Sequence, residues 1–179
     1  MAPNIEQANV INHLTGNEMT HSRNVLVESA RLARGEIIDL GEANPENYDG
    51  VIVPGGFGVA KNLSDYALAG ARMKISEKVV NFVTAIHRAK KPVGLICISP
   101  TLAPKLFEGG VRCTVGDDKL TATAINTMGG IHENCTADEI VVDEKRLVVS
   151  TPAYMIGERI SEVAEGIEKL VDEVLYMTK

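Results

Sequence analysis

Cys97 stands where a nucleophile is often found, between a buried strand and a helix. It ends the apolar run 93–97, which lies between Pro92 and Pro100 and predicts a short strand. Ser99 and Pro100 then favour a helix start, because serine is a common N-cap and proline a common first helical residue. Near a helix N-terminus the reactive thiolate is favoured over the thiol. On the evidence of this run alone, a reactive nucleophile and a small buried cysteine that only ends a strand are equally good interpretations of Cys97.

A second apolar strand, residues 51–53, leads into a loop with three glycines, of which Gly55 and Gly56 come first. Glycine lets the chain turn sharply and lets a ligand approach the backbone N–H groups closely. In a parallel α/β sheet this loop and Cys97 would meet at the edge where such proteins bind ligands. The N–H groups of Gly56 and Ile98, with Gly55 beside them, are therefore candidates for an oxyanion hole. A simple turn is the alternative.

The alternation of helical and strand patterns predicts a mostly parallel sheet with helices on both faces. Apolar residues recur at helical spacing in residues 74–89 and from 156 to 174, and start and stop signals bound a further helix at 21–34. Strands are predicted at 36–40, 51–53, 93–97 and 111–115, and residues 139–150 predict an antiparallel hairpin appended to the sheet.

Four long segments resemble the ElbB/ES1 branch of the DJ-1/PfpI superfamily, whose members are class I glutamine amidotransferase-like proteins. The segments extend over essentially the whole chain, at residues 10–37, 51–67, 91–107 and 140–155. The resemblance implies a flavodoxin-like three-layer α/β sandwich, one domain over residues 1–179 and a homodimer. It also implies that Cys97 is the nucleophile of a weak glyoxalase, converting glyoxal to glycolate without a cofactor. The alternative is a non-catalytic scaffold or a redox-sensing stress protein.

The chain departs from the family pattern at three places. Residues 150–154 read Ser-Thr-Pro-Ala-Tyr where glutaminase members carry a His-x-Glu pair, and residues 112–117 lack the histidine of some other relatives. Both absences argue against a glutaminase. Residues 1–4 resemble the segment that follows the second strand in relatives, so we expect the strand-helix-strand unit with the acidic partner of Cys97 to be missing. Such a loss would leave a slot in the sheet, filled for example by a neighbouring subunit.

Four other residues are possible parts of the site. The second hairpin strand should deliver Thr151 and Pro152 to the end of the sheet that carries the cysteine. Asp117 follows the strand 111–115 at the same edge, but Asp117 and Asp118 are more typical of a helix N-cap than of an acid pair. His132 precedes the stretch that contains Cys135 and is the histidine that we consider for the site, although a structural role is commoner for such a residue than a catalytic one.

Lys61, just after the glycine loop, has two interpretations. It could pair with an anionic product such as glycolate, or it could lie solvated at the rim. One lysine without a second cation is a weak anion site, which favours the solvated role.

Composition and charge fit a single intracellular domain. The chain has 179 residues, 45% of them hydrophobic, and a formal charge of −6 argues against nucleic acid or an anionic membrane as the main partner. It shows no apolar run of membrane-spanning length and no signal-peptide pattern, so we expect the cytoplasm, or the mitochondrion in a eukaryote. The cysteines have no CxxC spacing, which predicts no disulfide and no metal site and makes Cys113 and Cys135 inert packing residues.

Overall fold

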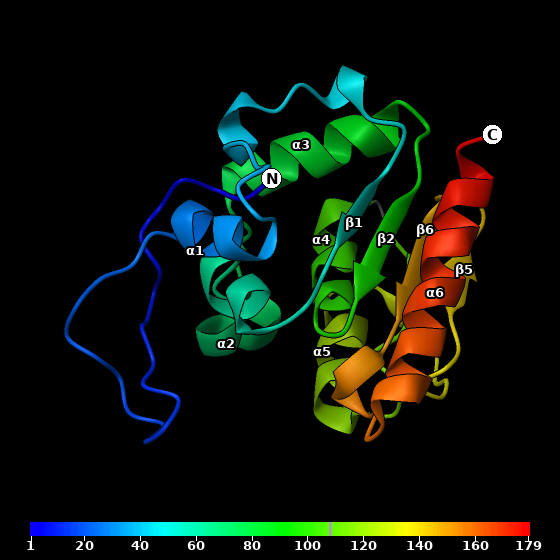
Figure 1. Cartoon of the computed structure of the whole chain (residues 1–179). Coiled ribbons are helices and arrows are strands. Elements are labelled where there is room, and N and C mark those ends of the chain that lie inside the picture. The colour runs from blue at the N-terminus through cyan, green and yellow to red at the C-terminus, as the bar shows by residue number, and fades with distance from the viewer. Residues whose placement is uncertain (108) are drawn as a thin grey trace.

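The main sheet of the computed structural model has four strands in the order β1-β2-β6-β5 (Figure 1). The model describes residues 1–107 and 109–179. β1, β2 and β6 run parallel, and β5 pairs antiparallel with β6, so the mostly parallel sheet with an appended hairpin is confirmed. The strands are β1 (Val51–Val53), β2 (Val93–Ile96), β5 (Val141–Asp143) and β6 (Val148–Thr151).

Helices cover both faces of this sheet and make three layers, as the resemblance implies. α6 (Ile160–Met177) packs on β2 and β6, and Leu170 and Val174 contact the strand face at Gly94, where a Cβ would lie 2.9 Å from Leu170. The opposite face carries one continuous core with residues from the sheet and from three helices. These helices are α3 (Glu77–Arg88), α4 (Ala103–Leu106) and α5 (Lys119–Thr127).

The apolar periodicity of α3 explains why it folds there. Val79, Phe82, Val83 and Ile86 are all buried, and their spacing puts them on one helical face. The other two predicted helices exist but begin later than expected. α1 (Val25–Leu32) starts after an N-cap at residue 24, whose side chain accepts the Val27 N–H, and α6 starts after a 3₁₀ turn, Ala153–Met155.

The predicted strand at residues 36–40 is wrong. Asp39 instead caps the 3₁₀ turn Leu40–Glu42, and its carboxylate accepts the N–H groups of Gly41 and Asn4 at 3.0 and 3.2 Å. Side-chain acceptors of this kind compete with strand pairing for backbone donors. A single parallel bridge between Ala2 and Asp39 is all the pairing that this segment makes among the described residues.

The predicted strand at residues 111–115 is shortened for a similar reason. Only β3 (Arg112–Cys113) pairs, in a small parallel sheet with β4 (Ile131–His132). The next backbone N–H groups go to side chains instead, Thr114 to the Ser150 hydroxyl at 3.0 Å and Val115 to His132 at 3.2 Å. The first of these bonds holds the small sheet against β6, and the second joins its own two strands.

β1 is an edge strand, and its outer side is open. The Val51 N–H donates to the Pro92 carbonyl at 3.1 Å, so in a parallel ladder the N–H and C=O of Ile52 face away from β2. A mainly apolar cavity of about 220 Å³ lies along this edge, between β1, α3 and residues 1–3. The slot expected from the sequence is thus an open edge of the sheet and not a gap between two strands.

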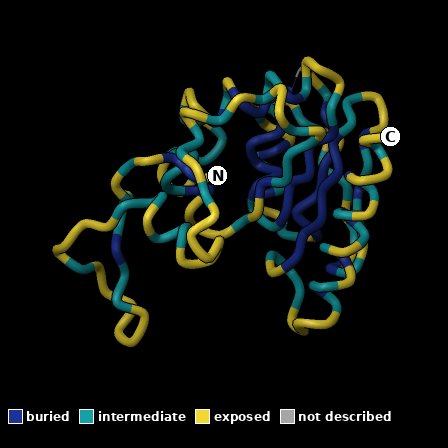
Figure 2. The backbone as a smooth tube through the Cα atoms, turned by 45° about the horizontal axis from the view of Figure 1, so that its top comes forward, coloured by how far each residue is buried: buried dark blue, intermediate teal, exposed yellow. Residues whose placement is uncertain are grey.

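Residues 4–24 form an N-terminal arm that extends away from the layered body (Figures 1 and 2). Most of the arm is exposed, whereas buried residues concentrate in the sheet and the helices beside it (Figure 2). Two isolated antiparallel bridges, Glu6 with Asn24 and Ile11 with Glu18, fold the arm back on itself. Short helical turns lie on either side of β1. The 3₁₀ turn Pro45–Asn47 precedes it, and a π-helical turn (Val59–Leu63), α2 (Tyr66–Ala69) and the 3₁₀ turn Gly70–Arg72 follow it.

Candidate active site

Cys97 follows β2 directly and has a backbone conformation that a cysteine rarely adopts. Its φ is 64°, in the left-handed region that costs a non-glycine residue about 1–3 kcal/mol. The strain is held by the sheet, because the Cys97 N–H donates to the Thr151 carbonyl at 2.9 Å. Such strain persists where the surrounding structure imposes it, and it clusters at functional sites. The side chain stays partly exposed.

The glycine loop packs against the thiol. A Cβ at Gly55 would lie 3.0 Å from the Cys97 sulfur and 2.9 Å from the Ile96 carbonyl, and it would clash with the Cys97 Cβ. Only glycine allows this approach. The Ser99 hydroxyl donates to the Pro54 carbonyl at 2.9 Å and so ties the loop to the chain just after the cysteine.

Two backbone N–H groups are available beside this contact. Among the described residues, the N–H groups of Gly56 and Ile98 make no hydrogen bond within the protein. Gly56 has a φ of 86°, which turns the loop sharply after Gly55. Free donors near a thiol can stabilise a developing oxyanion.

The helix after Cys97 differs from the sequence prediction. Ser99 is not an N-cap. The N-cap residue is Ile98, whose side chain makes no capping hydrogen bond. Ser99 begins a 3₁₀ turn, Ser99–Leu102, and the four residues of α4 follow it. Two short turns supply a weaker dipole than one long helix. The strained backbone of Cys97 and the glycine loop therefore define the site more than the electric field of a helix dipole does.

Thr151 and Pro152 do reach the cysteine's end of the sheet. Thr151 acts there through its backbone carbonyl, which accepts the Cys97 N–H. Its hydroxyl donates to the Glu139 carbonyl at 2.9 Å, on a different side. Pro152 is buried at the start of the turn Ala153–Met155. Thr151 therefore positions the cysteine, and neither residue offers it an acid or a base.

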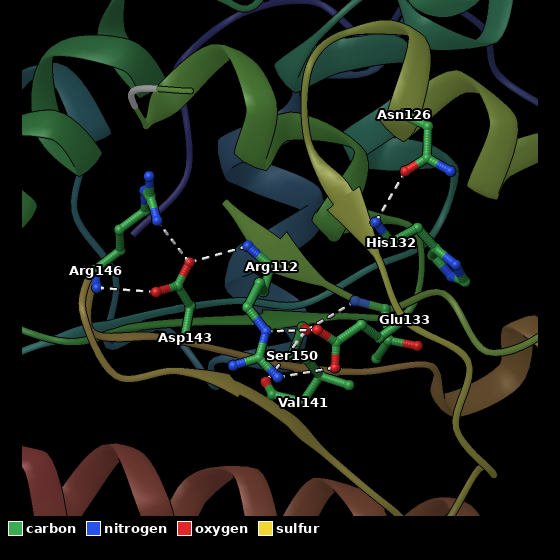
Figure 3. Close-up of polar contacts among 9 residues, drawn as sticks. Arg112, Asn126, His132, Glu133, Val141, Asp143, Arg146 and Ser150 are labelled. Atoms are coloured by element: carbon green, nitrogen blue, oxygen red, sulfur yellow. Dashed lines mark hydrogen bonds and ion pairs between the residues drawn. The ribbon is translucent and has the colours of Figure 1, made fainter. Parts of the chain in front are cut away.

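His132, Asp117 and Asp118 lie together at the end of the small sheet, with structural contacts. The His132 ring nitrogen Nε2 accepts the Val115 N–H at 3.2 Å. The His132 backbone N–H donates to the Asn126 side chain at 2.9 Å (Figure 3). Burial lowers the pKa of His132, against the opposing charges of nearby carboxylates. Within the described residues, no side chain makes a hydrogen bond to the Cys97 sulfur.

Asp118 is the N-cap of α5, as its pattern predicted. Its carboxylate accepts the Thr121 N–H at 2.8 Å, and hydrogen bonds from Thr121 lower the pKa of Asp118. Asp117 is exposed. The two residues therefore do not form an acid pair.

His132→Gln should flatten the pH dependence of stability below pH 6.5. A folded-state pKa below the usual 6.5 means that neutral His132 contributes its full stabilisation above pH 6.5. That stabilisation is lost as the pH falls through the folded pKa, because the unfolded chain binds the proton first. Glutamine retains an acceptor that does not titrate. Urea unfolding at several pH values measures the effect, and parallel curves for the two proteins would contradict it.

The other two cysteines are poor nucleophiles. Cys113 is fully buried, its thiol faces the Pro100 carbonyl, and burial raises the pKa of Cys113 to about 12. Cys135 is partly buried beside the Thr114 hydroxyl, and burial raises its pKa as well. Only a thiolate attacks efficiently, so burial makes both residues poorer nucleophiles than an exposed thiol of ordinary pKa. Among the described residues, no group of three or more His, Cys, Asp or Glu could hold a metal ion.

Sequence reasoning missed the contact between the arm and the glycine loop. Asn62 accepts the Ala8 N–H at 2.8 Å, and the Lys61 ammonium donates to Asn9 at 3.2 Å and lies 5.4 Å from the centre of the Phe57 ring. Lys61 is therefore held in place, not solvated at the rim as expected. The arm residues Ala8 and Asn9 lie more than 50 positions away from Asn62 and Lys61, so no local pattern signals the contact with the arm.

Gly55→Ala should displace Cys97 and destabilise the fold by about 1–3 kcal/mol, as overpacking a tight contact does. The added methyl would overlap the cysteine side chain. Gly58→Ala is the matched control, because that residue has helical backbone angles and no atom near its Cβ position. Thermal unfolding and Cys97 alkylation rates check both variants. Equal behaviour of the two variants would show that the tight contact is not needed.

The comparison with known proteins decides the family. The DJ-1/PfpI family model matches residues 14–164. The chain belongs to the DJ-1/PfpI family. A rat protein named ES1 protein homolog, mitochondrial, is 41% identical over 187 aligned residues, covering 99% of this chain and 70% of the relative. A human mitochondrial protein, glutamine amidotransferase-like class 1 domain-containing protein 3, is 42% identical with coverages of 99% and 69%.

A solved structure supports the same assignment. The isoprenoid biosynthesis protein with amidotransferase-like domain from Ehrlichia chaffeensis superposes with a TM-score of 0.91 at 34% identity, over 99% of this chain and 81% of that one. Together with the ES1 relatives, it places this DJ-1/PfpI protein in the ElbB/ES1 branch and bears out the three-layer fold. None of the helices in residues 1–107 and 109–179 is long and apolar enough to cross a membrane.

Proposed function

We propose that this DJ-1/PfpI protein is a weak cysteine-dependent glyoxalase that converts glyoxal to glycolate. The observation that carries the proposal is the geometry of Cys97. The residue is strained at φ 64°, packs on Gly55 and lies beside the unengaged N–H groups of Gly56 and Ile98. This arrangement suits thiolate addition to a small aldehyde, with the two N–H groups facing the alkoxide that forms.

The reaction balances without a cofactor. The Cys97 thiolate adds to one aldehyde carbon and gives a hemithioacetal. A proton then leaves that carbon and another is added to the second carbonyl carbon, through an enediolate. The first carbon is thereby oxidised to a thioester and the second reduced to an alcohol. Water hydrolyses the thioester, releasing glycolate and the thiol.

The rate should be low because the proton transfer lacks a side-chain base. A positioned acid or base typically contributes about 10²–10⁴-fold. Within the described residues none is hydrogen-bonded to Cys97, and His132 and Asp118 are engaged elsewhere. Water or hydroxide must then carry the proton.

Glycolate formation from glyoxal tests the proposal. Wild-type protein should exceed the buffer background, Cys97→Ser should fall to background, and Cys113→Ser should retain the wild-type rate if it folds. Wild-type protein at background, or equal activity in Cys97→Ser, would overturn the enzymatic function.

The alternative function is a redox-sensing stress protein, and the missing base favours it. A strained, partly exposed thiol without a catalytic partner can still be oxidised to a sulfenic acid. Dilute peroxide followed by a sulfenic-acid trap should then label Cys97. Absence of the label would exclude this role.

We propose the cytoplasm or the mitochondrion as the location, on the basis that two curated relatives have names that place them in mitochondria. We also propose a homodimer. The open edge of β1 exposes backbone groups beside an apolar cavity, and pairing with a second chain would cover both. Light scattering at micromolar concentration should give twice the chain mass. A monomer at all concentrations would contradict it.

A further inference from the structure

A basic pocket lies at the end of the sheet opposite to Cys97. It is a cavity of about 410 Å³ between α3, α4 and the turn that joins β5 to β6. This turn contacts the start of β2, where the Val93 N–H donates to the Leu147 carbonyl at 2.9 Å, whereas Cys97 follows the end of β2. The basic pocket is therefore separate from the candidate active site. Its lining residues are Thr84, His87, Arg88, Leu106, Lys145 and Arg146.

Positive charge is concentrated in the basic pocket. Arg88, Lys145 and Arg146 are cations, and among the described residues none that lines the pocket is acidic. The chain as a whole carries a formal charge of −6, so the pocket reverses the sign of the charge locally. A concave surface that carries one sign of charge raises the local concentration of ions of the opposite sign.

Nearby negative charge offsets only part of this excess. The Asp143 carboxylate pairs with the Arg146 guanidinium at 3.1 Å (Figure 3). Neither Arg88 nor Lys145 pairs with a carboxylate among residues 1–107 and 109–179, and Glu144 is exposed and does not line the pocket. The C-terminal end of α3 adds about half a negative charge. About one and a half positive charges remain, which matches the charge of about −1.5 to −2 on a phosphate monoester at neutral pH.

The walls of the basic pocket are partly withdrawn from solvent. Leu106 is buried, the Arg146 side chain is 20% exposed, and the His87 ring packs on Phe107 with the ring centres 4.7 Å apart. Charges in such a setting interact more strongly than charges on an open surface. The cavity is also large enough for a small molecule, and Leu106 offers its organic part an apolar contact.

We propose that the basic pocket binds the phosphate group of a small phosphomonoester. Arg88 lies on α3 and Lys145 in the β5–β6 turn, so a phosphate held by both would join these two elements. A guanidinium matches two phosphate oxygens with parallel N–H donors, and an ammonium adds a compact charge. The proposal does not depend on the proposed glyoxalase function, because Cys97 does not line the pocket.

Calorimetric titration with phenyl phosphate tests the proposal. Binding should saturate at one site per chain and should weaken as salt is added, because the attraction is electrostatic. Phenylmalonate carries the same ring and the same charge on two carboxylates, and it should bind at least about fivefold more weakly, since it lacks the tetrahedral set of phosphate oxygens. Equal affinity for phenylmalonate would overturn the phosphate assignment. No saturable binding of phenyl phosphate would overturn the whole proposal.

Arg88→Met and Lys145→Met should each weaken the binding of phenyl phosphate about three- to tenfold, the effect of one partly solvated charge. Both residues are exposed, so the variants should fold, and thermal unfolding without ligand checks this. Lys119→Met is the matched control, because it removes the same charge from an exposed position at the start of α5, outside the pocket. Unchanged affinity in either pocket variant, or an equal loss in Lys119→Met, would overturn the proposal.

Cys97→Ser separates the basic pocket from the candidate active site. This variant should bind phenyl phosphate as tightly as wild-type protein does, whether or not either of them turns over glyoxal. A loss of affinity in Cys97→Ser would place the phosphate at the glycine loop and overturn the assignment to the basic pocket.

Discussion

Iodoacetamide at pH 8 is expected to alkylate Cys97 at least about 100-fold faster than Cys113 in the folded protein. Cys113 has no exposed surface, and with a pKa of about 12 only about one thiol in 10⁴ is ionised at that pH. Cys97 is partly exposed at the end of β2. Peptide mapping at timed intervals measures the three rates separately.

Cys135 is the internal control for exposure. Like Cys97 it is partly buried, but burial raises its pKa and it lies outside the glycine loop. It should react more slowly than Cys97. Equal labelling of all three cysteines, with the fold intact by circular dichroism, would remove the case for a nucleophile.

Asp143→Ala is expected to destabilise the protein by about 3–5 kcal/mol, the usual effect of removing one partner of a buried ion pair. Asp143 is 2% exposed, and its carboxylate accepts the N–H groups of Arg112 and Arg146 and pairs with the Arg146 guanidinium at 3.1 Å (Figure 3). These contacts join the β5–β6 hairpin to β3. Urea unfolding measures the loss.

Asp172→Ala provides the matched control for that loss. Asp172 is exposed on α6, and surface substitutions of this kind usually stay within about 0.5 kcal/mol. A loss below 1 kcal/mol in Asp143→Ala, comparable to the control, would show that the hairpin does not depend on this carboxylate.

The sequence predicts the elements whose apolar patterns are strong and local. β1, β2, the hairpin and α3 follow from short buried runs and from one helical stripe. At residues 111–115 polar side chains take the backbone N–H groups that a longer strand would use, and at residues 36–40 the Asp39 carboxylate instead caps a turn that begins at Leu40. Pattern reading sees apolar periodicity and cannot see such acceptors.

The candidate site is likewise only partly predictable from the sequence. Cys97 and its glycine loop are visible in the sequence, because a strand end and a glycine cluster are local features. The φ of 64° at Cys97 and the close approach of Gly55 need coordinates. The contact between the N-terminal arm and the turn after the glycine loop joins segments far apart along the chain, such as Asn9 and Lys61, so no spacing could indicate it.

The most direct test of the central claim is to look for the adduct on Cys97 itself. Glyoxal labelled with ¹³C should give, in wild-type protein, a hemithioacetal resonance and a slow accumulation of glycolate. Glyoxal should also protect the peptide that contains Cys97 from alkylation by iodoacetamide, as read by peptide mapping, and Cys97→Ser should show neither the resonance nor glycolate. Glycolate formed at the same rate by Cys97→Ser, or an adduct confined to other residues, would contradict the assignment of Cys97 as the nucleophile.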